Sequence, residues 1–88
     1  MSEALELLRS MNSDALTADG FDEALIGVLS RPGRPPVAVY DIRRCLEILS
    51  RDMTEDDAEE YFAFNTLDAY VGPLTPVYMD FRWRSTAS

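Results

Sequence analysis

The side chains that most often perform catalysis at neutral pH are nearly absent from this chain. It has no histidine and no lysine, and Cys45 is its only cysteine. Without histidine there is no common general base near pH 7 and no base to activate a serine or cysteine nucleophile. One cysteine cannot form a thiolate zinc site, and the scattered glycines do not make a phosphate-binding loop. We therefore expect a non-enzymatic protein that works by contact, with no cofactor and no metal.

Carboxylates are the main remaining chemistry, and the sequence Asp19-Gly20-Phe21-Asp22 places two of them three residues apart around a turn. Carboxylate oxygens at such spacing are ligands for hard cations such as Ca²⁺. An EF-hand loop starting at Asp19 would need a glutamate at its twelfth position, where this chain has Ser30. We therefore interpret the cluster as a turn that anchors Phe21 in the core.

A small-ligand or metal-binding module is the alternative. It requires the start of the first strand to lie beside the end of the second, as in an antiparallel hairpin. Four polar residues would then come together: Asp19, Asp22, Asp41 and Asn65. Asn65 also has a structural interpretation, because an amide on an apolar helix face must find partners, and the backbone at the helix end supplies them.

The net charge of −8 limits the partners. An acidic surface repels nucleic-acid phosphates and anionic membranes and favours a protein with a basic surface, from host or phage. The most acidic segment carries Glu55, Asp56, Glu59 and Glu60. Such a run is ordinarily a solvated helix face. The alternative is that it imitates phosphates in a basic groove.

Aromatic residues are numerous for so small a core, and tyrosine, tryptophan and arginine dominate interface hot spots. Phe64 lies off the apolar stripe of its helix, and Tyr78 lies off the expected inward face of the last strand. With Arg82 and Arg84 they form the candidate contact surface. Cys45 lies on an apolar stripe and is expected to be a small buried hydrophobe.

Hydrophobic periodicity and turn residues define the elements that must position these groups. We expect helices at Ser2–Met11, at Ile42–Arg51 and from Thr54 onward, and strands at Ala24–Ser30, Val37–Tyr40 and Val77–Trp83. Ser2, Asp41 and Thr54 are the expected N-caps. The proline-rich loop 31–36 predicts an antiparallel hairpin.

The same periodicity predicts which residues point inward. The expected stripes are Ala4, Leu7, Leu8 and Met11; then Ile42, Cys45, Leu46 and Leu49; then Ala58, Tyr61, Phe62, Asn65 and Ala69. In the last strand, Val77, Met79, Phe81 and Trp83 are expected to alternate with outward residues.

The order α-β-β-α-α-β predicts one small α+β domain, with a three-stranded, mainly antiparallel sheet and helices packed on one face. Residues 1–18 form the N-terminal helix and connector, 19–84 the core, and 85–88 a flexible tail. With no apolar run of about 20 residues and no signal-peptide pattern, we expect a cytoplasmic protein. If the last strand lies at an edge, it could pair with another copy, which gives a structural homo-oligomer or homodimer as a further alternative.

Several short motifs resemble a group of short phage and prophage proteins that has no assigned activity. The motifs are Asp19-Gly20-Phe21-Asp22-x-Ala24, Val39-Tyr40-Asp41, Arg51-Asp52-Met53-Thr54, Ala58-x-Glu60-Tyr61-Phe62-x-Phe64-Asn65, and Ala69-Tyr70-Val71-Gly72 with Thr75-Pro76. The likeness covers residues 19–79 and carries over no catalytic residue. It implies a phage setting, in which small acidic proteins act as inhibitors of host enzymes or defence systems, in the manner of anti-CRISPR proteins.

Overall fold

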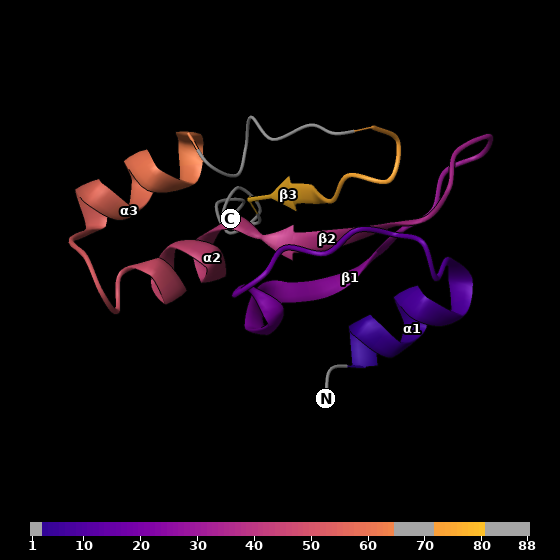
Figure 1. Cartoon of the computed structure of the whole chain (residues 1–88), viewed down its shortest axis with the longest axis horizontal. Coiled ribbons are helices and arrows are strands. Elements are labelled where there is room, and N and C mark those ends of the chain that lie inside the picture. The colour runs from indigo at the N-terminus through magenta and orange to yellow at the C-terminus, as the bar shows by residue number, and fades with distance from the viewer. Residues whose placement is uncertain (1–2, 65–71, 81–88) are drawn as a thin grey trace, which may run out of the picture.

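The computed structural model describes residues 3–64 and 72–80 (Figure 1). Its elements are α1 (Glu3–Met11), the 3₁₀ turn η1 (Asp22–Ala24), β1 (Leu25–Leu29), β2 (Val37–Asp41), α2 (Ile42–Leu49), α3 (Glu55–Phe62) and β3 (Val77–Met79). The predicted fold class is confirmed: this is a small α+β domain in the order α-β-β-α-α-β. Within the described residues, no helix is both long and apolar enough to cross a membrane.

The sheet has the strand order β1-β2-β3, so β2 is central. β1 and β2 form the predicted antiparallel hairpin, with Leu25 opposite Tyr40 and Leu29 opposite Val37. β3 pairs with β2 in parallel, and Tyr78 is the partner of Tyr40. A parallel neighbour requires a crossover, and the chain segment that contains α2 and α3 supplies it.

The predicted N-caps Asp41 and Thr54 form, whereas Ser2 lies outside the described residues. The Asp41 carboxylate accepts a hydrogen bond from the Arg43 N–H at 3.0 Å, and the Thr54 hydroxyl accepts one from the Asp57 N–H at 3.1 Å. Each cap satisfies an amide that the first helical turn leaves without a partner. The acidic first turn of α3 also lies at the positive end of its helix dipole.

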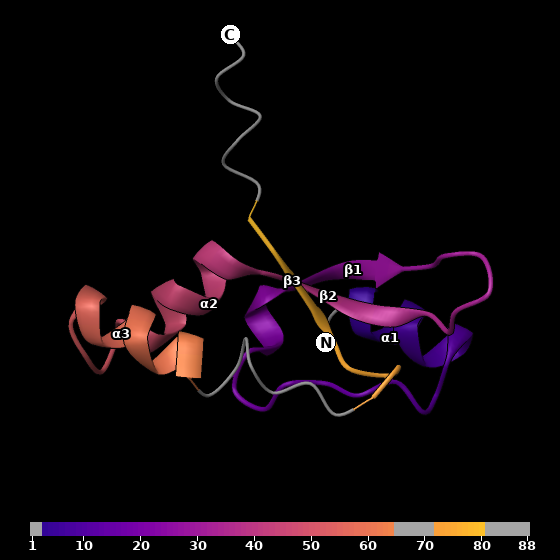
Figure 2. The ribbon, with the colours of Figure 1, turned by 90° about the horizontal axis from the view of Figure 1, so that it is seen from above.

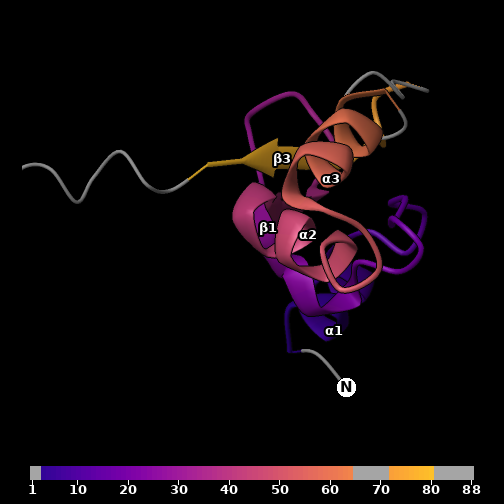
Figure 3. The same ribbon diagram turned by 90° about the vertical axis from the view of Figure 1, so that its left-hand side faces the viewer.

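The three helices take different positions around the sheet. α1 packs mainly against β1. α2 and α3 continue beyond the end of β2, whereas the β1–β2 loop projects from the opposite end (Figure 2). Seen from the α2–α3 end, α1 and β3 lie on opposite sides of β1 (Figure 3). The acidic helix α3 and α1 lie at opposite ends of the molecule (Figure 1).

The core is small and partly aromatic. Tyr40 and Leu8 are fully buried, and Phe21 meets Phe62 edge to face with ring centroids 6.2 Å apart. Cys45, on the predicted stripe of α2, is also fully buried. The core thus joins α1, both hairpin strands, α2 and α3.

Two predicted helix stripes need correction. In α1, Leu5 packs on the core in place of Leu7 and Met11, which are exposed. In α3, Tyr61 is 47% exposed, while Phe62 is 2% exposed. Successive helical residues point about 100° apart, so a helix that packs through a narrow face buries only one of two adjacent aromatics.

The predicted facing of the last strand is also wrong within the described residues. Tyr78 packs against the core, whereas Met79 is 41% exposed. The pairing of β3 with β2 explains this. Directly paired residues share one face of a sheet, and the partner of Tyr78 is the fully buried Tyr40. Phe81 and Trp83 lie outside the described residues.

Candidate functional site

The four acidic candidates all lie exposed on α3. Their helix is held to the domain through Ala58 and Phe62, which are one turn apart and buried. The rest of the helix surface presents carboxylates to solvent: Glu55, Asp56, Glu59 and Glu60. Between residues 51 and 64 there are six carboxylates and one arginine, so this segment is strongly negative.

Phe64, two residues after the end of α3, is 72% exposed, the largest exposed fraction among the large hydrophobic residues that the structure describes. Tyr61, one turn earlier, is also exposed. Sequence reasoning placed both Tyr61 and Phe62 in the core. Because adjacent helical residues point about 100° apart, their being neighbours was the signal that one of the two would be exposed. Phe64 and Tyr61 add aromatic surface beside the carboxylates. We call this set the α3 surface: Glu55, Asp56, Glu59, Glu60, Tyr61 and Phe64.

Tyr78 does not join an exposed contact surface in the way we expected. Its ring stacks on Tyr40 at 5.5 Å and meets Phe62 edge to face at 5.4 Å. Burial raises the pKa of the Tyr78 phenol to about 12. Tyr78 therefore packs against the buried face of α3 through Phe62. Arg82 and Arg84, its predicted companions, lie outside the described residues.

Two residues of the ligand-binding alternative, Asp19 and Asp22, are exposed. The hairpin brings the start of β1 beside the end of β2, as that alternative required. Asp41 caps α2 and lies 3.8 Å from the Arg44 guanidinium. In the part of the chain that the structure describes, no three acidic or cysteine side chains gather as a metal site. Asn65 lies outside that part.

Cys45 has no features of a reactive thiol. Its side chain is buried, and burial raises its pKa from 9.0 to about 12, with the Asp41 charge adding to the effect. A thiol of this kind stays protonated at neutral pH and is a poor nucleophile. The interpretation of Cys45 as a small buried hydrophobe agrees with this environment.

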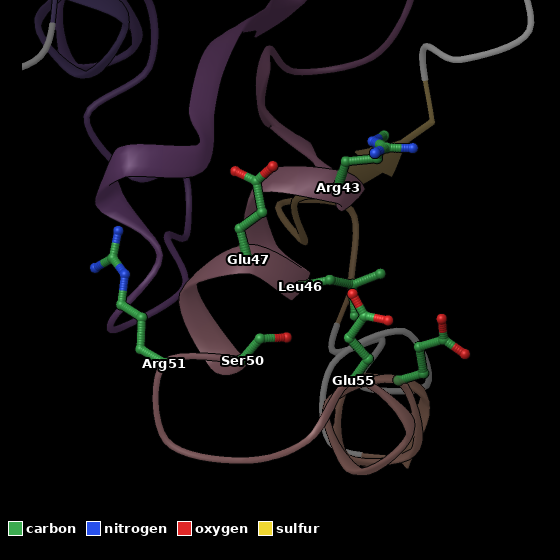
Figure 4. A pocket seen from close by; sticks show the side chains of 7 residues that line it. Arg43, Leu46, Glu47, Ser50, Arg51 and Glu55 are labelled. Atoms are coloured by element: carbon green, nitrogen blue, oxygen red, sulfur yellow. The ribbon is translucent and has the colours of Figure 1, made fainter.

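An open cleft of about 430 Å³ lies between α2 and α3 (Figure 4). Its lining comes from both helices and the turn between them: Arg43, Leu46, Glu47, Ser50, Arg51, Glu55 and Glu59. Sequence reasoning identified only the two α3 carboxylates. The i,i+4 spacing of Arg43 and Glu47, and of Glu55 and Glu59, was readable, but their meeting depends on how the two helices pack.

Arg51 is engaged at the margin of this cleft. Its guanidinium donates a hydrogen bond to the Glu23 carboxylate at 2.8 Å, which ties the end of α2 to η1. This hydrogen bond, together with the charge of Glu23, raises the pKa of Arg51 above its ordinary value. Both side chains are solvent-exposed, so the pair adds little stability.

Comparison with known proteins gives no match: no family model fits the chain, and no curated protein or solved structure is significantly similar to it.

Proposed function

We propose that this chain is a non-enzymatic binding protein that attaches to a protein partner with a basic surface, through the α3 surface. The observation that carries the proposal is Phe64, a large aromatic side chain that is 72% exposed at the end of an acidic helix. Leaving such a ring in water forgoes the stabilisation of burial, and contact with a partner recovers it.

The surroundings of Phe64 suit a contact surface. A central aromatic anchor supplies most of the binding free energy in many interfaces, while charged residues around it set orientation and association rate. On α3 the surrounding charges have one sign. A basic partner would therefore be attracted over several ångströms, and an acidic one would be repelled.

The biological setting follows from the resemblance to short phage and prophage proteins. It supports a role as an inhibitor of a host defence protein, of the anti-CRISPR type or another anti-defence type. The α3 surface would then occupy a basic groove built for nucleic acid, with its carboxylates in place of phosphates. Such mimicry needs closely spaced negative charges, and the first turn of α3 has three in succession.

Affinity capture from a bacterial host lysate tests the proposal. The tagged chain should retain a partner, and Phe64→Ala should lower the retained amount about tenfold, as truncation of an aromatic anchor does. The double reversal Asp56→Lys, Glu60→Lys should lower it similarly. The matched control is Glu6→Lys, Asp14→Lys, which makes the same charge change at sites remote from α3 and should retain the partner.

Two results would contradict the proposal. One is a folded wild-type chain that captures nothing from several host lysates. The other is a partner whose capture is equally strong with Phe64→Ala and with the α3 charge reversal. Circular dichroism of each variant shows whether it is folded, so loss of binding is not confused with loss of structure.

A structural homo-oligomer is the second candidate, and the edge position of β3 favours it. Among the described strands, β3 pairs only with β2, and a strand from another copy could pair with its other edge. Sedimentation equilibrium distinguishes this candidate. A dimer supports it, whereas a 9.9 kDa monomer at high concentration excludes it.

A further inference from the structure

We infer that the cleft between α2 and α3 receives the guanidinium group of an arginine side chain from the protein partner. This inference rests on the proposed binding function and names the chemistry by which one part of that partner is recognised. The cleft is open to solvent and has a volume of about 430 Å³, so an extended side chain can enter it from outside.

The charges on the α2 wall of the cleft are balanced. Arg43 and Glu47 lie one helical turn apart and carry opposite charges. Arg51 is paired with Glu23 at 2.8 Å. The α2 wall therefore offers no net charge to a ligand.

The α3 wall of the cleft carries a net negative charge. Glu55 and Glu59 lie one turn apart on the face that lines the cleft. Within the described residues, neither carboxylate accepts a hydrogen bond from another side chain, and neither forms an ion pair. In Figure 4 the Glu55 carboxylate lies between α3 and Leu46, directed toward the cleft. The charge complement of this wall is a cation, and an anionic ligand would be repelled.

The side chains that line the cleft favour arginine over a metal ion. No three acidic or cysteine side chains come close enough to hold a metal among the described residues. A guanidinium has five N–H donors in a planar fork, so one group can donate to two carboxylates at once. Leu46, which is half-buried between the two walls, can pack against the apolar stem of the arginine.

A titration followed by NMR tests the inference without the partner. The ¹⁵N-labelled chain is mixed with Nα-acetyl-arginine amide, with the citrulline analogue, which is neutral and nearly isosteric, or with the lysine analogue. We expect amide shifts in residues 43–59 with arginine that are at least about threefold larger than with either analogue, since only arginine supplies the charged fork. Equal shifts with citrulline or lysine would overturn the assignment to arginine, as would shifts spread evenly over all acidic segments.

Variants of α3 provide the second arm. Glu55→Gln together with Glu59→Gln should abolish the arginine response. Asp57→Asn removes one charge from the same helix outside the cleft lining and should preserve it. An unchanged response in the double variant would overturn the inference.

The two proposals fail separately. A captured partner with no arginine response at the cleft would overturn this inference alone. An arginine response in a chain that captures no partner would overturn the proposed function and leave the selectivity of the cleft established.

Discussion

The rings of Tyr78 and Tyr40 stack with centroids 5.5 Å apart and planes inclined by 24°. The two residues are direct neighbours across the parallel β2–β3 pair, so the stack forms only when β3 pairs with β2 in this register. Tyr78 also touches Phe62, one of the two buried residues of α3. The short strand β3 and the acidic helix are thus fixed to each other through one aromatic side chain.

Replacing Tyr78 with alanine should therefore loosen both elements. We expect a loss of about 2–4 kcal/mol in the free energy of unfolding, because truncating a packed aromatic ring removes buried area and leaves a cavity. Urea denaturation followed by circular dichroism measures it. Met79→Ala, at the exposed neighbouring position, should cost less than about 1 kcal/mol. Similar losses at both positions would show that Tyr78 has no special role in packing.

Tyr40 should be sensitive to loss of its hydroxyl group alone. The backbone N–H of Ala18 donates a hydrogen bond of 2.9 Å to this oxygen, and the Tyr40 side chain is fully buried. Tyr40→Phe leaves the amide without that partner, so we expect a cost of about 1–3 kcal/mol. Faster hydrogen exchange at Ala18 should accompany it. Tyr78→Phe is the control, and equal effects in the two variants would argue against the Ala18 bond.

Local chemistry made much of this fold predictable. Asp41 and Thr54 precede apolar helical stripes and cap them as expected, because a capping side chain acts on amides only two or three residues away. The proline-rich loop likewise brings β1 beside β2. The pairing of β3 was not readable. Alternation indicates a strand but does not indicate its neighbour, and the neighbour decided that Tyr78 faces inward.

The candidate site was only half predictable for the same reason. Glu55 and Glu59 stand out in the sequence as part of an acidic run. Arg43 and Glu47 have ordinary spacing on another helix, and only the packing of α2 against α3 brings them to the same cleft. Exposure of Tyr61 also depends on how far α3 is rotated about its axis.

Cys45 should make the protein less stable in mild alkali. Its thiol has a pKa of 9.0 in the unfolded chain and about 12 in the folded one. Above pH 9 the unfolded chain therefore releases a proton that the folded chain keeps, and rising pH favours unfolding until the folded thiol also ionises near pH 12. Urea midpoints should be constant up to about pH 8 and fall above pH 9.

Cys45→Ala separates this effect from the tyrosines. Burial also raises the pKa of Tyr40 and Tyr78 above 10.0, so their contribution is lost only at higher pH. The variant should be less stable at pH 7, but its midpoint should stay level to about pH 10. A fall from pH 9 in the variant as steep as in the wild type would contradict the assignment to Cys45.

The Thr54 cap should control how well α3 presents its acidic surface. Thr54→Ala removes the acceptor for the Asp57 N–H, and we expect a loss of about 1 kcal/mol with faster amide exchange in the first turn of α3. Thr54→Ser keeps the hydroxyl oxygen and should recover most of the loss. If serine and alanine behave alike, the cap does not stabilise the helix.

Salt should weaken the attachment of a basic partner to the α3 surface. Raising the ionic strength from about 0.05 M to about 0.5 M shortens the screening length from more than 10 Å to less than 5 Å. We expect the association rate to fall about tenfold or more, with a smaller change in the dissociation rate, because Asp56 and Glu60 act mainly before contact. Surface plasmon resonance with the captured partner measures both rates. Phe64→Ala should instead raise the dissociation rate and leave the salt dependence intact. Binding that is insensitive to salt would rule out imitation of nucleic acid by α3, whatever the effect of Phe64.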